Sequence, residues 1–315
     1  MSNKILLATT LLTILGTLSP AGAADGDRPL LDLLHHLDRE FDRADLPAEA
    51  TFLDHKGRPI QGVRCATRPV PDVERGLIAA AVDRHLASAG IAHRKRAIEI
   101  PIAFHVLHRP NGQWNVTDEQ IDAQMDVLND AFAGTGFSFA LDRVARHARN
   151  KFAKKCLSRR VEKKFKERYA VDPATTLNVY SCQPRGILGY AYLPSDHPED
   201  NFLHGVVVRY SSLPGGDGAP YDLGDTLVHE IGHYLGLLHT FQGKCGTKGD
   251  RIADTPAEKR PGYGCPIGRD TCPNDPGTDP VTNFMDYADD ACMVEFSPDQ
   301  VTRMMDQVAT FKPSL

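Results

Sequence analysis

The chain has 315 residues, of which 41% are hydrophobic and 24% are charged. This length and composition suit one sizeable globular domain or two small ones. The net charge of -5 and the isoelectric point near 6.2 argue against nucleic acid as the main partner, because nucleic-acid-binding proteins present a basic face.

Residues 1–23 have the pattern of a secretory signal peptide. Lys4 supplies a positive charge, the stretch ILLATTLLTILGTL is apolar, and the small residues from Ala21 to Ala23 form a cleavage site. A membrane anchor is the alternative, but the apolar stretch is too short to span a bilayer comfortably. We therefore expect secretion to the extracellular space, or to the periplasm of a two-membrane bacterium, with no membrane anchor left after removal of the signal. Disulfide bonds persist in such compartments.

Residues 24–96 form a separate segment in this interpretation. The spacing of apolar residues predicts helices at residues 30–41 and 73–90, and residues 54–72 between them are predicted to be extended or looped. The basic triplet Arg94–Arg96 then precedes an alternating apolar strand. We place a domain boundary and a protease cleavage site at Arg96, with an ordinary solvated basic cluster as the alternative.

Residues 97–315 show a mixed α and β pattern. Thr117 is followed three residues later by Gln120, which is a capping box that begins a helix, and this cap explains Thr117 better than the glycosylation sequon at Asn115. Beyond residue 240 little regular structure is expected before a last helix that begins at Ser297. Strands are predicted at residues 98–107, 137–141, 175–182 and 204–210, helices at 117–133 and 297–311, and a glycine-rich loop at 213–224.

The stretch HEIGHYLGLLH carries the chemistry. His229 and His233 are four residues apart, so on a helix both imidazoles lie on one face and can reach one ion. Gly236 lets the chain leave the helix, and the turn brings back His239. Three neutral nitrogen ligands with one open position are typical of a catalytic zinc site. Glu230 lies beside the first ligand, where it is placed to take a proton from zinc-bound water.

Two plainer readings compete with a catalytic zinc site. A helix can carry histidines by chance, but this motif fixes five positions in order, which makes a chance match improbable. A zinc site without catalysis is the other reading. Glu230 argues against it, because a structural site needs no base and usually binds zinc through thiolates.

The sequence NFMDY, residues 283–287, follows this motif. Met285 alone is typical of an ordinary protein core. After an extended zinc-binding helix, the same residue predicts the tight methionine turn that lies beneath the metal in metzincins. Tyr287 follows two residues later, and its hydroxyl group is predicted to stabilise the oxyanion of a tetrahedral intermediate.

With these motifs in place, residues 97–310 resemble the pappalysin family of the metzincin clan, and within it the small secreted forms. The resemblance rests on the order and spacing of LVHEIGHYLGLLHTFQG, DRIADTP, GYGCP, DTCPNDPGTDPVTNFMDYADDACM and FSPDQVTRM. It implies an α/β (α+β) fold of two lobes, with a mixed twisted sheet and helices in the N-terminal lobe and an irregular, disulfide-stapled C-terminal lobe. The cleft then lies between the lobes, with zinc held by the three histidines.

The resemblance also implies structural calcium near the zinc-binding helix. The matching stretch is GDRIADTP, in which Asp250, Asp254 and Thr255 offer the oxygen ligands that calcium prefers. A solvated acidic loop is the alternative reading of these residues.

The chain has seven cysteines, an odd number. Four lie in the C-terminal region, where a segment rich in loops needs covalent cross-links. Four cysteines allow three pairings, and the sequence alone does not choose among them. The family resemblance implies Cys245–Cys272 with Cys265–Cys292. Cys156 and Cys182 are a candidate third pair, which leaves Cys65.

Cys65 lies in the segment before the Arg94–Arg96 boundary. A thiolate is a good zinc ligand and would fill the open coordination position. The stretch RCATR therefore predicts a cysteine switch, in which residues 24–96 form a pro-segment across the cleft and inhibit the catalytic domain, residues 97–315. Small pappalysins resemble this arrangement, with a cysteine after an arginine, although Ala66 stands where a glycine is common. A buried or mispaired cysteine is the alternative.

The sequence thus predicts a secreted zinc endopeptidase, made as a latent zymogen, that acts on proteins or peptides. Zinc-bound water would attack the peptide carbonyl, and Glu230 would pass its proton to the leaving amine. The alternatives are a zinc amidase for another bond, such as one in peptidoglycan, and a binding module with an inactive protease fold. The Met-turn and extended motif weigh against the first, and the intact base and ligands against the second.

The stretch YADDACM follows the Met-turn and is expected to line the pocket for the residue after the cut bond. A carboxylate at Asp289 or Asp290 would favour Arg or Lys in that pocket. We then expect the enzyme to process itself near Arg96.

Overall fold

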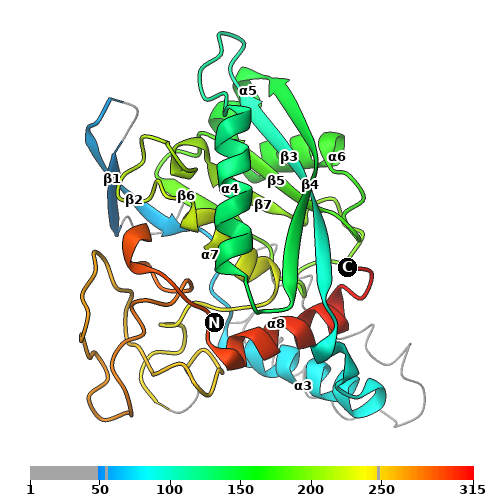
Figure 1. The fold of residues 1–315 in the computed structure, drawn as a ribbon, viewed down its shortest axis with the longest axis vertical. Helices are drawn as coiled ribbons and strands as arrows, with labels where there is room; N and C mark the ends of the chain where they lie inside the picture. Colours follow the sequence, from blue (N-terminus) through cyan, green and yellow to red (C-terminus); the bar gives the residue numbers. More distant parts are fainter. Residues whose placement is uncertain (1–48, 54–55, 247–248) are drawn as a thin grey trace, which may run out of the picture.

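The computed structural model describes residues 49–53, 56–246 and 249–315 (Figure 1). The predicted signal peptide, residues 1–23, and the helix predicted at residues 30–41 lie outside these ranges. Among the helices within them, none is long and apolar enough to cross a membrane.

A seven-stranded mixed sheet forms the centre of the molecule. Its strands are β1 (Ala50–Leu53), β2 (Pro59–Cys65), β3 (Ile98–His108), β4 (Phe137–Ala148), β5 (Leu177–Cys182), β6 (Ile187–Ala191) and β7 (Val206–Arg209). Their order in space is β1-β2-β6-β7-β5-β3-β4. β3 is parallel to β4 and β5, and β5 is parallel to β7. β6 is antiparallel to β7, whereas β2 is parallel to β6. β1 is antiparallel to β2.

Helices cover both faces of this sheet. They are α3 (Asp72–Ala89), α4 (Asp118–Ala131), α5 (Asn150–Lys155), α6 (Arg159–Tyr169), α7 (Asp225–Tyr234) and α8 (Pro298–Phe311), with short 3-10 helices η3 (Ala92–Lys95), η4 (Tyr210–Ser212) and η5 (Asp290–Cys292). Side chains of a strand alternate between the two faces. Val206 and Val208 therefore join the core formed with α4, α7 and α8, while Val207 packs with α6 on the other face.

The mixed α/β architecture confirms the predicted fold class. The predicted capping box forms with Thr117 at the start of α4, and the last helix begins at Ser297 as predicted, where the side chain also forms a capping box. The sequence analysis missed α5, α6 and β6. Residues 150–169 carry so many charges that the buried positions of α6, Val161 and Phe165, do not stand out as an apolar face.

The chain after α7 has little regular structure. Between Leu235 and Ser297, the described residues form turns, one isolated bridge and η5. Disulfide bonds tie this region together and join the end of α5 to β5 on the other side of the sheet. They are Cys245–Cys272, Cys265–Cys292 and Cys156–Cys182, and Cys65 is free and buried. The first two are the pairs that the resemblance implied, and the third is the candidate pair.

Residues 49–96 pack against the rest of the chain at two places. β2 extends the sheet beyond β6 and ends with Cys65 opposite Gly189. α3 packs along α8, as Figure 1 shows near the bottom of the molecule. Just after α3, Arg94 forms an ion pair with Asp306 of α8 at 2.6 Å. The chain around the expected cleavage site at Arg96 is therefore held to the last helix.

Candidate metal centre

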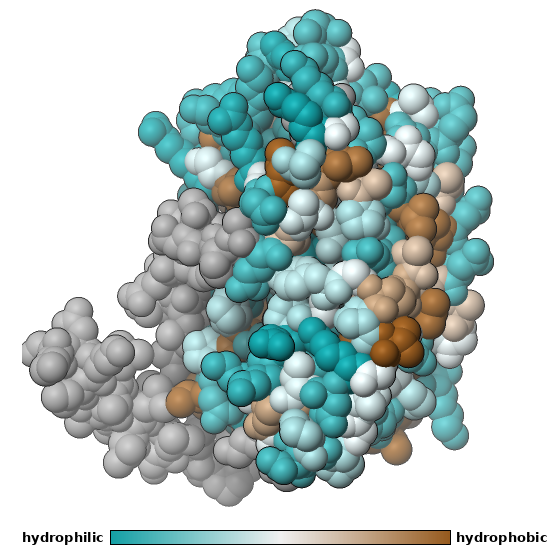
Figure 2. Space-filling model, turned by 90° about the vertical axis from the view of Figure 1, so that its left-hand side faces the viewer, coloured by the Kyte–Doolittle hydropathy of each residue, from teal (hydrophilic) through white to brown (hydrophobic). Residues whose placement is uncertain are grey.

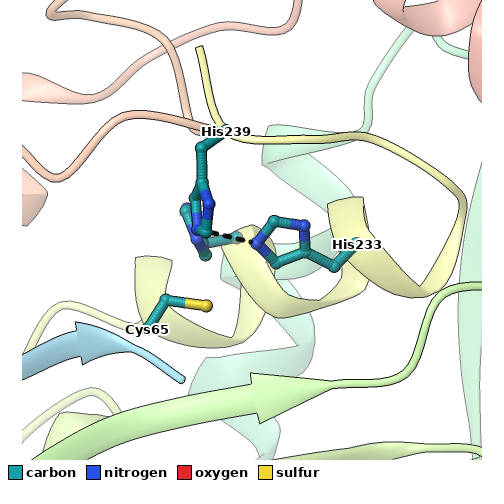
Figure 3. Close-up of side chains that lie close together, drawn as sticks. Cys65, His233 and His239 are labelled. Atoms are coloured by element: carbon teal, nitrogen blue, oxygen red, sulfur yellow. Dashed lines mark hydrogen bonds between the residues drawn. The ribbon is translucent and has the colours of Figure 1, made fainter. Parts of the chain in front are cut away.

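The three histidines of the motif converge on one point. His229 and His233 lie one turn apart on α7, with ring centroids 4.8 Å apart. Gly236 adopts a φ of 103°, which ends the helix, and the chain turns to bring in His239. The donor atoms of these histidines and of Cys65 all lie within 4.8 Å of one another. Figure 3 shows the Cys65 sulfur pointing toward the imidazole rings.

The environment of the rings suits a metal ion. The Nδ1 atoms of His229 and His233 lie 2.6 Å and 2.8 Å from the carbonyl oxygens of Phe284 and Leu237. Such bonds fix the tautomer that leaves Nε2 free to bind a metal. His229 Nε2 is buried and has no hydrogen-bond partner among the described residues.

Burial also keeps the imidazoles neutral. It lowers the pKa of His229 and His239 well below the usual value and that of His233 to about 4. Neutral, buried nitrogen donors beside a thiol are the ligands that Zn²⁺ prefers. The residues present therefore fit a zinc ion.

Glu230 lies beside this cluster and is fully buried. Its side chain packs closely on β6, because a Cβ atom added to Gly189 would lie 2.8 Å from Glu230 Cγ. Thr67 Oγ1 donates a hydrogen bond to Glu230 Oε2 at 3.0 Å, and Cys65 Sγ donates to the same oxygen at 3.4 Å. The carboxylate is therefore engaged by two residues from the segment before residue 97.

Met285 and Tyr287, from the turn after the zinc-binding motif, both contact this cluster or the helix that carries it. Met285 is fully buried and contacts the backbone of α7 at Gly232, where a Cβ atom would clash with its sulfur. The Tyr287 hydroxyl lies 3.1 Å from His239 Nε2 and donates a hydrogen bond to the carbonyl oxygen of Cys65 at 3.2 Å. The hydroxyl thus reaches the same cluster as the four donor atoms.

A buried ion pair lies next to the centre, and the space that the Arg64 side chain fills beside Asp290 is called the Asp290 pocket. Arg64 is fully buried, and its Nη2 lies 3.3 Å from Asp290 Oδ1. Its Nη1 donates to Thr226 Oγ1 at 2.8 Å, and its guanidinium lies 4.8 Å from the ring of Tyr221. Asp289, the other acidic candidate, is only partly buried, and its backbone N–H donates to Gly264. The structure thus brings Asp290 to the arginine.

Asp225 adds a second carboxylate near this pocket, which the sequence analysis missed. Burial, followed by the charge of Asp290, raises the pKa of Asp225 to about 7. Burial also raises the pKa of Asp290 to about 6, although the charge of Arg64 opposes this shift. Burial is the largest cause of both shifts, and the charge of Arg64 opposes both of them.

The three candidate calcium ligands do not converge. Thr255 Oγ1 donates to both carboxylate oxygens of Asp250, each at 2.9 Å. Asp254 points elsewhere: it accepts hydrogen bonds from the Ser297 hydroxyl at 2.6 Å and from the backbone N–H of Asp299 at 2.9 Å. Asp254 therefore caps the start of α8, while Asp250 and Thr255 stay together.

Buried acids that no sequence spacing indicated brace the loop on the far side of the histidines. Arg269 pairs with Glu258, and its Nε lies 2.7 Å from Asp279 Oδ2. Glu258 also accepts a hydrogen bond from Thr240, the residue after His239, at 2.7 Å. Through Thr240, this cluster helps to hold the segment that carries the third ligand, His239.

The comparisons with known proteins agree with this geometry. The family model described as pregnancy-associated plasma protein-A matches residues 161–309. An extracellular metalloprotease of Pyricularia oryzae is 37% identical over 246 residues, which are 76% of this chain and 86% of the relative. One of Colletotrichum graminicola is 39% identical over 232 residues, 72% of this chain and 82% of the relative.

Two solved structures from Tannerella forsythia are also similar. A promirolysin mutant superposes with a TM-score of 0.62 and 27% identity over 74% of this chain and 87% of that one. Mature mirolysin in complex with a cleaved peptide superposes with a TM-score of 0.58 and 30% identity over 67% of this chain and 91% of that one.

Proposed function

The chain belongs to the pappalysin family of metzincin zinc metalloendopeptidases, and from this we propose that it is secreted as a latent zymogen whose residues 24–96 block its own active site. The observation that carries the proposal is the convergence of Cys65 with His229, His233 and His239 on one point. Secretion is supported by the relatives, which are named extracellular metalloproteases.

The roles of the residues follow from their places. His229, His233 and His239 hold zinc, which when bound supplies Lewis acidity at the scissile carbonyl. Glu230 takes a proton from the attacking water and passes it to the nitrogen of the leaving amine as the C–N bond breaks. The Tyr287 hydroxyl donates a hydrogen bond to the oxyanion that forms from the carbonyl.

Latency rests on contacts between the pro-segment and each of these groups. The Cys65 thiol lies among the histidine donor atoms. Thr67 and Cys65 hydrogen-bond to Glu230, and the carbonyl of Cys65 accepts the Tyr287 hydroxyl. Base, oxyanion donor and metal position are therefore occupied together. In keeping with a pro-segment, promirolysin covers 74% of this chain and mature mirolysin 67%.

The preference for Arg or Lys after the scissile bond is supported by Arg64. This side chain lies in the pocket beside the metal centre and pairs with Asp290 at 3.3 Å. A substrate arginine is the chemical equivalent of the group that already fits there. Self-processing near Arg96 follows from the same preference, because residues 94–96 are all basic.

Calcium binding is proposed for the loop that carries Asp250 and Thr255. Asp250 and Thr255 remain together as candidate oxygen ligands, whereas Asp254 is used to cap α8. We therefore assign any calcium site to the first two residues together with backbone oxygens.

The test is cleavage of a mixed peptide library by the full-length protein after limited proteolysis, with Glu230→Ala prepared in parallel. Zinc content and folding are measured on both proteins, so that a negative result is not a loading failure. Cuts made by the wild type alone, clustered before Arg or Lys, are the expected result. Cuts that persist in Glu230→Ala would remove Glu230 as the base. A folded, zinc-loaded wild type that cuts nothing would overturn the peptidase proposal.

A further inference from the structure

The path that β2 follows beside β6, from Cys65 back toward Ile60, is called the groove. A cavity of about 560 Å³ lies at its far end, where β6 begins. Its wall is unusual for an acidic protein, because four of the residues that the catalytic domain contributes are basic and, among the described residues that line it, none is acidic. These basic residues are Arg109, Lys154, Arg185 and Arg209. They come from four separate segments: the ends of β3 and β7, α5 and the β5–β6 loop.

The positions of these side chains are fixed by local contacts. Arg109 Nε donates to Asn150 Oδ1 at 3.0 Å, and its guanidinium lies 5.6 Å from the ring of Trp114. Trp114, the only tryptophan of the chain, adopts a φ of 64°, a conformation that bulky residues rarely take. The loop that carries both residues lies at the top of Figure 1, and Figure 2 shows that the upper end of this side of the molecule is largely hydrophilic.

The pro-segment forms one side of this cavity in the zymogen. Arg58, just before β2, and Ile60 and Gln61 of β2 contribute to its wall. Phe52 of β1 covers Arg209, whose guanidinium lies 4.9 Å from the phenyl ring. Departure of the pro-segment therefore opens the cavity toward the groove and uncovers a buried arginine.

The register of β2 gives the distance of the cavity from the metal centre. Along the groove, Cys65 lies at the metal, Arg64 fills the Asp290 pocket, and Gln61 and Ile60 lie at the cavity. The cavity is thus three to four residues beyond the Asp290 pocket, about 10 Å of extended chain. A substrate whose residue after the cut bond enters the Asp290 pocket continues into this cavity.

We infer that the cavity is a second specificity site, which binds an acidic side chain of the substrate three or four residues after the basic residue in the Asp290 pocket. This inference rests on the proposed peptidase function. Several cations around one carboxylate give a favourable Coulomb interaction, and removal of the pro-segment leaves all four of them in place.

The test uses three peptides that differ at one position and are cut by the activated protein. Each has Arg after the scissile bond and Glu, Gln or Lys three residues further on, with a second set at four residues. We expect kcat/KM to be about fivefold higher for Glu than for Gln and lowest for Lys, with the preference shrinking as salt is added.

A pair of variants assigns the preference to the cavity. In Lys154→Gln/Arg185→Gln the ratio of kcat/KM for Glu over Gln should fall well below the wild-type value, because two of the four cations are removed. In Lys154→Glu/Arg185→Glu the ratio should fall to near one, because two acids then balance Arg109 and Arg209. Lys151→Gln is the control, because Lys151 is an exposed lysine on the same helix α5 that does not line the cavity.

Equal rates for the three wild-type reactions, or a preference that is unchanged in both double variants, would overturn the inference while leaving the peptidase intact. If the activated wild type cuts none of the peptides, the proposed function fails and the inference fails with it.

Discussion

Arg64 Nη2 lies 3.3 Å from Asp290 Oδ1, and neither side chain has any exposed surface. A buried ion pair gains little net stability, because two charges have been removed from water. Removing one partner is costly, however, since the other charge is then buried alone. Residue 64 of the proposed pro-segment thus supplies the cation that pairs with Asp290. We propose that a basic substrate residue takes this place in the mature enzyme.

The first prediction concerns this pocket. Asp290→Asn should lower kcat/KM for peptides with Arg after the scissile bond by about a hundredfold, because the buried guanidinium loses its counter-charge. Peptides with Met at that position should be affected far less. Asp289→Asn is the matched control and should have the smaller effect, since Asp289 is partly exposed. Equal losses in the two variants would contradict the assignment of the pocket to Asp290.

The pH dependence of specificity provides a second prediction. Burial raises the pKa of Asp290 to about 6, and only the ionised carboxylate pairs with arginine. The ratio of kcat/KM for Arg over Met peptides should therefore be highest above the pKa and fall as the pH decreases through about 6. Measuring the ratio between about pH 5 and pH 8 removes pH effects on the chemistry that both peptides share. The ratio should be flat in Asp290→Asn.

Latency provides the third prediction. Cys65→Ala should raise the peptidase activity of the uncleaved chain by at least about tenfold, because it removes the thiol from the metal position. Thr67→Val is the comparison, since it removes a hydrogen bond to Glu230 but leaves the thiol, and its effect should be smaller. Activity is measured before any cleavage, with the intact mass checked. A Cys65→Ala chain as silent as the wild type would place latency in the strand pairing and the Arg64 pocket instead.

Zinc should also support the fold. Removal by a chelator should abolish activity and lower Tm by several degrees, because an ion that binds only the folded state stabilises it. Added zinc should restore both. His233→Ala should show neither the loss nor the recovery of Tm. If the chelator removes zinc from the wild type and Tm does not change, zinc has no role in the stability of the fold.

The candidate calcium ligands can be separated from one another. Calcium should raise Tm of the wild type, and Asp250→Asn should abolish this response. Asp254→Ala should lower stability by about 1 kcal/mol, because it removes the acceptor for the Asp299 N–H at the start of α8, but it should keep the response to calcium. Loss of the calcium response in both variants would show that Asp254 also contributes to the calcium site.

The parts of the site that could be predicted from the sequence are those that one helix and one turn create. The i, i+4 spacing places His229 and His233 on one face, and Gly236 explains the turn to His239. The pocket around Arg64 could not be derived in this way. Asp225 and Thr226 are neighbours at the start of α7, whereas Asp290 comes from η5. Only tertiary packing brings these two parts of the chain to Arg64 of β2.

The strands also differ in how far they can be predicted from the local sequence. Strands with regular apolar alternation, such as β3, were predicted close to their bounds. β6, the strand beside the metal centre, has every residue buried and therefore no alternation to find. The pairing of Cys65 with Gly189 depends on that strand, so the sequence alone indicated the switch but not how it is held.

The ion pair between Arg94 and Asp306 helps to hold the pro-segment in place after the chain is cut. Cleavage at Arg96 and release of the pro-segment are therefore separate events. A cut at Arg96 breaks the chain, but it leaves β2 in the sheet, α3 on α8 and Arg64 in its pocket. None of these contacts needs the peptide bond that was broken. Activation should therefore show a lag after the cut. The severed pro-segment should act as a dissociable inhibitor, so the inhibited fraction of the enzyme should fall as the protein is diluted.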